Sequence, residues 1–166
     1  MLMVYFYSMK TTKILMVCLG NICRSPLAEG IMAEKLKSLN KPFFIDSAGT
    51  GGWHAGEPPD HRSIEVAEKY GIDISGQRAR KITLNDLETF DYIFTMDEEV
   101  QKDVIGLTEN TTQKSKIFLM LSFAGFKGNV IVPDPYWGGK EEFEATYKLL
   151  DKACNQIIPR IITELT

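Results

Sequence analysis

Short apolar segments alternate with segments of helical periodicity along this chain, and that alternation limits the fold more than any other feature. Residues 13–18 form an apolar run that ends at Gly20 and Asn21, which is typical of a strand buried on both faces. Ser25 and Pro26 then predict the start of a helix, with Ser25 as its N-cap, that ends near Asn40. Further strands are predicted at 43–47, 92–95 and 117–121, and further helices at 60–70, from 83, at 98–105 and at 143–165. This order predicts an α/β protein in which a parallel sheet carries helices on both faces.

The length and charge of the chain limit its organisation and its partners. No repeat or linker divides the 166 residues, so we expect residues 13–166 to form a single domain after a short N-terminal extension, residues 1–12. Nineteen Lys and Arg against 22 Asp and Glu give a net charge of −3, which provides no attraction to nucleic acid. The longest uncharged stretches have about ten residues, half of what a membrane span requires. Three cysteines without a regular framework indicate a reducing compartment, and we expect a cytoplasmic monomer.

The loop after the first predicted strand, residues 18–26, has the composition of an anion-binding site. Gly20 and Asn21 tolerate left-handed backbone, which lets successive peptide N–H groups point inward. The helix that follows adds the positive end of its dipole, and Arg24 offers two parallel donors to phosphate oxygens. The loop also lies at the carboxyl end of its strand, where open parallel sheets bind ligands. We therefore expect phosphate or sulfate to bind in this loop.

Cys18 stands at the base of this loop. Donors and positive charge lower the pKa of a cysteine into the range of about 3.5–7.5, so Cys18 is predicted to be an ionised nucleophile that faces the phosphorus of a bound monoester. Ser25 can donate its hydroxyl proton to the sulfur. Taken alone, Cys18 would fit equally well as a small buried side chain that ends a strand. Its neighbours, Asn21 and Arg24 above all, favour the nucleophile.

The departing oxygen of a phosphoester needs an acid, and Asp134 is the candidate for that role. Two prolines flank it, and Tyr136 and Trp137 follow. A Pro-Asp-Pro segment is also a common rigid turn, but this one follows the last predicted strand, where the loops of the sheet converge. The two histidines, His54 and His61, are interpreted as solvated polar residues.

Three motifs resemble those of the low-molecular-weight protein tyrosine phosphatases. They are residues 17–26, Val-Cys-Leu-Gly-Asn-Ile-Cys-Arg-Ser-Pro; residues 46–49, Asp-Ser-Ala-Gly; and residues 134–136, Asp-Pro-Tyr. The resemblance runs from about Lys13 to the last helix. It implies a three-layer, flavodoxin-like fold with a four-stranded parallel sheet, and a two-step hydrolysis of phosphotyrosine or small aryl phosphates without metal or cofactor.

The resemblance also implies roles for individual residues. Cys18 forms a phosphocysteine, Arg24 binds the phosphoryl oxygens, and Asp134 protonates the leaving group and then activates water. Ser47 holds the loop together with Asn21 and Ser25. The residues implied to surround the substrate are Leu19, Gly20, Asn21, Ile22, Cys23, Ser25, Trp53, Tyr136 and Trp137. Oxidation of Cys18 is expected to lead to a reversible disulfide with Cys23.

Two positions depart from the family pattern. Members often carry a His that supports the loop asparagine, and Gln77 stands in its place here. The acid loop has Trp137 where members have a second tyrosine, so a regulatory phosphorylation could use Tyr136 alone. The aromatic wall is retained, because an indole also stacks.

Three other functions compete with phosphotyrosine hydrolysis. Phosphoarginine phosphatases of the same family carry Thr in place of Ile22, whose branched alkyl group favours an aryl substrate. Arsenate reductases on this fold use two further cysteines, yet no cysteine lies between Cys23 and Cys154. A phosphate-binding module without turnover would not need the set of Cys18, Arg24 and Asp134.

Overall fold

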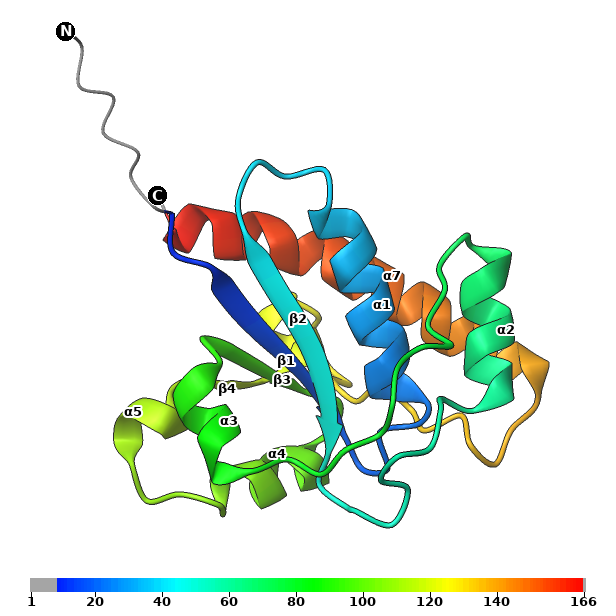
Figure 1. Ribbon diagram of the computed structural model, residues 1–166, viewed down its shortest axis with the longest axis horizontal. Helices are drawn as coiled ribbons and strands as arrows, with labels where there is room; N and C mark the ends of the chain where they lie inside the picture. The colour runs from blue at the N-terminus through cyan, green and yellow to red at the C-terminus, as the bar shows by residue number, and fades with distance from the viewer. Residues whose placement is uncertain (1–8, 166) are drawn as a thin grey trace, which may run out of the picture.

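The computed structural model describes residues 9–165 and has an α/β architecture in three layers (Figure 1). Its strands are β1 (Thr12–Cys18), β2 (Phe43–Gly49), β3 (Tyr92–Thr95) and β4 (Ile117–Leu119). The longer helices are α1 (Arg24–Leu36), α2 (His61–Lys69), α4 (Glu98–Ile105) and α7 (Lys140–Glu164). The shorter ones are α3 (Leu84–Thr89), α5 (Thr111–Lys114) and α6 (Met120–Phe123). The predicted order of strands and helices is confirmed.

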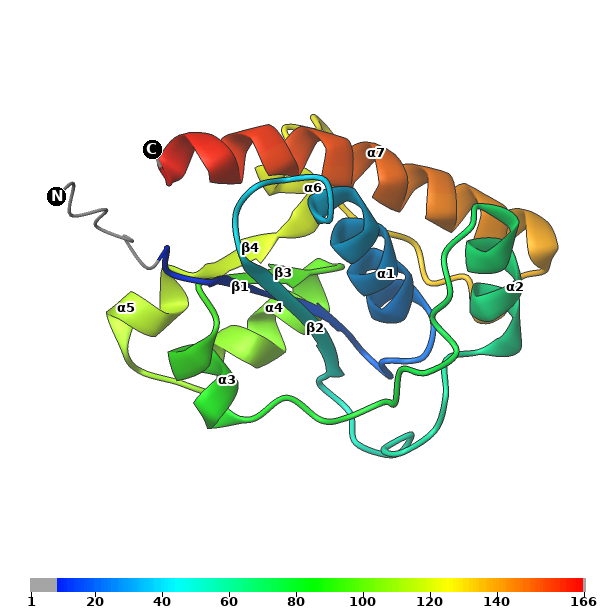
Figure 2. The same ribbon diagram turned by 45° about the horizontal axis from the view of Figure 1, so that its top comes forward.

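The four strands form one parallel sheet in the order β2-β1-β3-β4. In β1, Ile14, Met16 and Cys18 face a core built with α1, α2 and α7, whereas Leu15 and Val17 face a second core built with α3 and α4. Figure 2 shows these two helical layers on opposite sides of the sheet. Because β1 is buried on both faces, its apolar run is continuous rather than alternating. The predicted three-layer, flavodoxin-like fold is confirmed.

Several predicted boundaries are wrong. The first strand begins one residue before the predicted start at residue 13, because Thr12 already pairs with Phe43 in the sheet; residues 1–8 of the predicted extension lie outside the described residues. Helix α1 begins at Arg24 and ends at Leu36, and Ser25 is not its N-cap, because its hydroxyl lies against Cys18 instead. The run at 117–121 divides into a three-residue strand and the first residues of α6.

Chain topology brings the loops after β1 and β3 together. β1 and β3 are neighbours in the sheet although they are far apart in the sequence. The chain leaves β1, forms β2 on one side of it, and then returns to form β3 on the other side. Such a reversal of strand order opens a crevice at the carboxyl ends of the strands. None of the described helices, α7 included, has the length and apolar composition needed to cross a bilayer.

Candidate active site

The loop from Cys18 to Arg24 folds around the sulfur of Cys18. Asn21 has a φ of 57°, the only positive φ of a non-glycine residue in the described chain, and its main-chain N–H donates to Cys18 Sγ at 3.3 Å. Left-handed backbone was also predicted at Gly20, but Gly20 does not adopt it. The glycine serves a different purpose there, since a Cβ would lie 3.2 Å from Cδ2 of His54.

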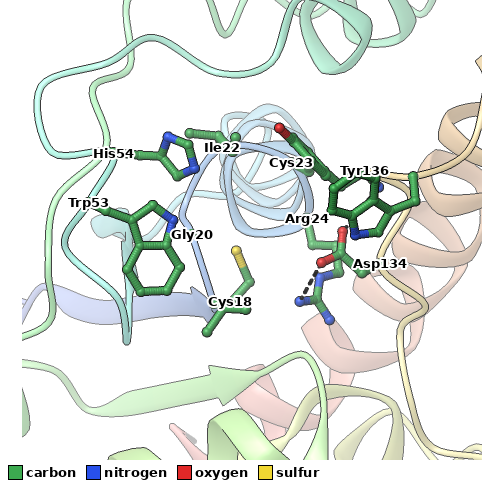
Figure 3. Close-up of a pocket in the computed structure, with 11 residues that line it drawn as sticks. Cys18, Gly20, Ile22, Cys23, Arg24, Trp53, His54, Asp134 and Tyr136 are labelled. Atoms are coloured by element: carbon green, nitrogen blue, oxygen red, sulfur yellow. Dashed lines mark hydrogen bonds and ion pairs between the residues drawn. The ribbon is translucent and has the colours of Figure 1, made fainter.

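The sulfur itself is only slightly accessible, and polar groups surround it. Cys18 is 2 % exposed, and its Sγ lies 3.0 Å from Ser25 Oγ. It stands at the base of an open cleft with a cavity volume of about 280 Å³. Figure 3 shows the sulfur directed into this cleft, between the walls that Trp53 and Tyr136 form. A tetrahedral oxyanion therefore has room above the sulfur.

The side chain of Asn21 holds the loop in this shape. Its Nδ2 donates to Ser25 Oγ at 2.8 Å and to Ser47 Oγ at 3.0 Å, and its Oδ1 accepts from the N–H of Arg80 at 3.0 Å. All three bonds are buried or partly buried, so leaving any donor without a partner would carry a desolvation cost of roughly 1–3 kcal/mol. The structure thus brings the predicted residues Asn21, Ser25 and Ser47 together.

Arg24 lies beneath the cleft and is held by three groups. Its Nη1 donates to Asp97 Oδ2 at 2.7 Å and to the carbonyl of Val132 at 3.1 Å, and its Nη2 lies 3.5 Å from Asp134 Oδ2. Burial opposes its charge, but Cys18, Asp97 and Asp134 together raise the pKa of Arg24 above its ordinary value. The guanidinium therefore stays charged in a buried position.

Asp134 enters the cleft from the long loop before α7. Its Oδ1 accepts from the main-chain N–H of Tyr136 at 3.1 Å, which orients the carboxylate. Its side chain is 43 % exposed, and Figure 3 shows it on the same side of the cleft as Arg24. An acid in this place can reach a leaving group that departs toward solvent.

Aromatic side chains line the mouth of the cleft. Trp53 and Trp137 are 64 % and 91 % exposed, and Tyr136 meets Trp137 edge-on with ring centroids 4.9 Å apart. His54 also lines the cleft, where its Nδ1 bonds Glu57, so it is not the freely solvated residue that the sequence suggested. The complete lining consists of Cys18, Leu19, Gly20, Ile22, Cys23, Arg24, Trp53, His54, Asp134, Tyr136 and Trp137.

Cys23 lies in the same loop as Cys18 and is also a free cysteine. Burial, and next the charge of Asp60, raise the pKa of its thiol far above the ordinary value. Cys23 is therefore held as the neutral thiol. No three His, Cys, Asp or Glu side chains in residues 9–165 gather in a way that would hold a metal ion.

The prediction that Gln77 supports Asn21 is wrong. Its Nε2 donates to the carbonyl of Pro26 at 3.1 Å, because the segment around it packs against the side of α1 rather than under the loop. Asn21 Oδ1 is met by the N–H of Arg80 instead, and Glu29 supports the loop indirectly by accepting a hydrogen bond from Ser47 Oγ at 2.5 Å.

Sequence reasoning missed both Glu29 and Asp97. Asp97 follows β3 at the carboxyl edge of the sheet, and that place in the pattern could have identified it. Glu29 carries no such signal, because an acidic residue on an amphipathic helix normally faces water.

Comparison with known proteins gives a consistent result. A family model described as low molecular weight phosphotyrosine protein phosphatase matches residues 13–166. Low molecular weight phosphotyrosine protein phosphatase 1 of Drosophila melanogaster is 40% identical over 144 residues, which cover 86% of this chain and 92% of that protein.

Solved structures match across the same length. A protein tyrosine phosphatase from Entamoeba histolytica with Hepes in its active site has a TM-score of 0.86 at 35% identity, covering 92% of this chain and 98% of that one. Vibrio vulnificus Wzb in complex with benzylphosphonate has a TM-score of 0.79 at 30% identity, covering 90% and 98%. A Drosophila arginine phosphatase has a TM-score of 0.83 at 30% identity with the same coverage.

Proposed function

The chain belongs to the low-molecular-weight phosphotyrosine protein phosphatase family, and on that premise we propose that Cys18, Arg24 and Asp134 carry out its reaction. The observation that supports this assignment is their placement around one cleft, with Sγ of Cys18 at its base and Asp134 bound to Arg24 on its wall. Cys18 and Arg24 come from one loop and Asp134 from the distant loop before α7, a convergence that a structural role for each would not require.

In the first step the Cys18 thiolate attacks phosphorus. The S–P bond forms as the P–O bond to the aryl group breaks, and the leaving oxygen takes the proton of Asp134. Arg24 and the inward N–H groups of the loop stabilise the charge on the equatorial oxygens. Ser25 donates to the sulfur, which stabilises the negative charge before attack.

In the second step water hydrolyses the phosphocysteine. Asp134, now a carboxylate, takes a proton from water while the water oxygen attacks phosphorus. The S–P bond breaks, its electron pair returns to the Cys18 sulfur, and inorganic phosphate leaves. The hydrogen bond from Ser25 that stabilised the thiolate before attack also stabilises it as a leaving group.

A phosphorylated tyrosine fits this cleft better than phosphoarginine does. Trp53 and Tyr136 line the cleft, where a planar ring can stack on them, and each aromatic pair contributes about 0.5–1.5 kcal/mol beyond burial. Ile22 adds an alkyl group to the lining, in place of the hydroxyl that the family resemblance implies for phosphoarginine phosphatases.

The remaining assignments follow from the same reaction. A catalytic thiolate needs a reducing environment, which supports a cytoplasmic location, and Cys18, Cys23 and Cys154 are all free. We assign residues 13–166 to one phosphatase domain, acting as a monomer on phosphotyrosine proteins. Under peroxide, Cys18 becomes a sulfenic acid, and attack by Cys23 expels water to form the disulfide.

Hydrolysis of an aryl phosphate by matched cysteine variants tests the nucleophile. Cys18→Ser should abolish turnover, whereas Cys154→Ala, which removes a buried thiol from α7, should leave kcat/KM within about twofold. Rapid acid quenching of wild type during turnover should yield phosphate bound to the peptide that contains Cys18. Full activity of Cys18→Ser would refute the assignment, and so would binding of phosphate without turnover by wild type.

A further inference from the structure

A chain of hydrogen bonds leads from the Cys18 thiol away from the cleft to a carboxylate that the proposed reaction does not use. Ser25 Oγ lies 3.0 Å from the sulfur and accepts from Asn21 Nδ2 at 2.8 Å. The same amide nitrogen donates to Ser47 Oγ at 3.0 Å. Ser47 Oγ in turn donates to Glu29 Oε2 at 2.5 Å. Glu29 lies one turn after Ser25 on α1, so the first hydroxyl and the final carboxylate of this hydrogen-bond series are both on one helix.

The hydrogen bond from Arg80 to Asn21 determines the direction of the other hydrogen bonds in this series. The N–H of Arg80 can only donate, so the atom of Asn21 that faces it is Oδ1, and Nδ2 donates to both hydroxyls. The hydroxyl proton of Ser25 is then available to the sulfur, and that of Ser47 to Glu29. A carboxylate accepts a hydrogen bond more strongly than a neutral group, so an ionised Glu29 completes the arrangement.

Glu29 has no cationic partner. The charged groups that act on it are Asp46 on β2 and Arg80, and the guanidinium of Arg80 is already engaged by Asp46 and Asp86. No Lys, Arg or His in the described chain forms an ion pair with Glu29. Gln77, which carries no charge, donates to the Pro26 carbonyl.

The helices around α1 supply no charge to Glu29 either. The buried residues of α2 and α7, which pack on α1, include no Asp, Glu, Lys or Arg. Lys35 of α1 pairs with Asp151 of α7 instead. Gly30 lets the neighbouring segment pack closely on this part of α1, since a Cβ there would lie 2.5 Å from Cγ2 of Ile74. Burial raises the pKa of Glu29 to about 7, despite the hydrogen bond from Ser47, which lowers it.

We propose that Glu29 is a positioning residue whose ionised form tightens the Ser47–Asn21–Ser25 chain, so that the loop binds a tetrahedral dianion more strongly when Glu29 is charged. Glu29 touches neither the substrate nor Cys18 and acts through Ser47 alone. The proposal rests on the proposed function, because it takes this loop as the phosphate site. Because no cation within residues 9–165 pairs with Glu29, its carboxyl is expected to gain its charge near neutral pH rather than at acidic pH.

Binding of tungstate, a tetrahedral oxyanion that stays dianionic from pH 5.5 to 8.5, tests the proposal without turnover. Glu29→Gln keeps an acceptor for Ser47 but cannot ionise. We expect it to weaken tungstate binding about three- to tenfold at pH 8.5 and less than about twofold at pH 5.5, with the change centred near pH 7. Glu34→Gln removes the same charge from the exposed side of α1 and should bind as wild type does at every pH. In a Ser47→Ala background, Glu29→Gln should have no further effect.

Three results would overturn the proposal. An equal loss at every pH would mean that Glu29 has only a structural role. Tighter binding by Glu29→Gln would mean that Glu29 acts as a repelling charge rather than through Ser47. A full Glu29→Gln effect that persists in the Ser47→Ala background would break the proposed path. If wild type neither binds tungstate nor hydrolyses aryl phosphates, the proposed function fails instead.

Discussion

Two carboxylates share the guanidinium of Arg24, and their surroundings give them different roles. Asp97 is fully engaged: Oδ2 accepts from Arg24, and Oδ1 accepts from the N–H of Val100 at 2.8 Å as the N-cap of α4. Asp134 is 3.5 Å from the guanidinium and has more than twice the exposure, 43% against 20%. Asp97 therefore holds Arg24 in place, whereas the Asp134 carboxylate stays accessible from the cleft, as its proposed role as the acid requires.

This difference predicts how the two variants depend on the leaving group. Asp134→Asn cannot supply a proton to the leaving oxygen in the first step, which kcat/KM reports. It should therefore lose about 10²–10⁴-fold in kcat/KM with phenyl phosphate and much less with p-nitrophenyl phosphate, whose leaving group needs little protonation. Asp97→Asn should lower kcat/KM by a similar factor for both substrates, because it loosens Arg24. Equal losses for both substrates in Asp134→Asn would contradict its role as the acid.

Burial of Glu29 also predicts a pH-dependent stability. Its pKa rises from 4.5 to about 7 on folding, so between these values the folded state holds the proton that the unfolded state has lost. The free energy of unfolding of wild type, relative to Glu29→Gln, should therefore fall by about 3 kcal/mol as the pH rises through this range, and level off once the pH exceeds the folded-state pKa. Urea unfolding at several pH values measures this difference, and a constant or rising difference would show that Glu29 is not a buried, proton-holding carboxyl.

At the level of elements, the end of β2 is the support on which the loop from Cys18 to Arg24 rests. Gly49 pairs with Cys18 in the sheet, and the N–H of Gly51 donates to the carbonyl of Leu19 at 2.9 Å. A Cβ at Gly49 would lie 2.7 Å from the Leu19 carbonyl oxygen and 3.1 Å from that of Gly51. Main-chain atoms cannot move aside as a flexible side chain can. Glycine is therefore required at this position because the main chain approaches it closely, not because of its φ.

Gly49→Ala should therefore disturb the loop as well as the fold. We expect a loss of about 1–3 kcal/mol in the free energy of unfolding, together with weaker phosphate binding. Gly76→Ala is the matched control, because a Cβ there meets no atom within 4 Å. Urea unfolding and phosphate titration of both variants measure the effect, and equal behaviour of the two would contradict it.

At the level of the whole molecule, the substrate cleft combines segments that are distant in the sequence. Cys18 ends β1 and Ile22 follows it, Trp53 follows β2, and Tyr136 comes from the loop before α7. The N–H of Val132 ties that loop to the sheet through the carbonyl of Met96, at 2.8 Å. The cleft has one charged end, at Arg24 and Asp134, and an apolar mouth, which suits a phosphate carried on a flat ring.

The nature of residue 22 should set the choice between substrates. Wild type should hydrolyse an aryl phosphate or phosphotyrosine peptide much faster than phosphoarginine. Ile22→Thr adds a hydroxyl and should lower the preference for the aryl substrate, measured as the ratio of the two kcat/KM values, by about tenfold or more. Ile22→Val is the control, because valine has the shape of threonine without the hydroxyl, and it should leave this ratio nearly unchanged. A wild-type preference for phosphoarginine would contradict this assignment.

Much of the fold could be predicted because it depends on short-range patterns. The apolar run that becomes β1 and the helix with Asp60 as N-cap follow from neighbouring residues. The helix start at Ser25 could not be predicted, since the partner that draws its hydroxyl away from a capping role is the sulfur seven residues earlier. The short α5 and α6 were missed because four residues carry too little periodicity.

The sequence by itself determined the strand–loop–helix unit that contains Cys18, Asn21 and Arg24, because covalent proximity and local backbone preference suffice to build it. Only the tertiary structure decided which carboxylates meet Arg24 and how far Glu29 is withdrawn from water. Asp97 lies 73 positions from Arg24, and Glu29 is partly buried on α1, where a segment from elsewhere in the chain packs against the neighbouring Gly30. Burial and long-range charge depend on the packing of distant segments, and no local pattern encodes them.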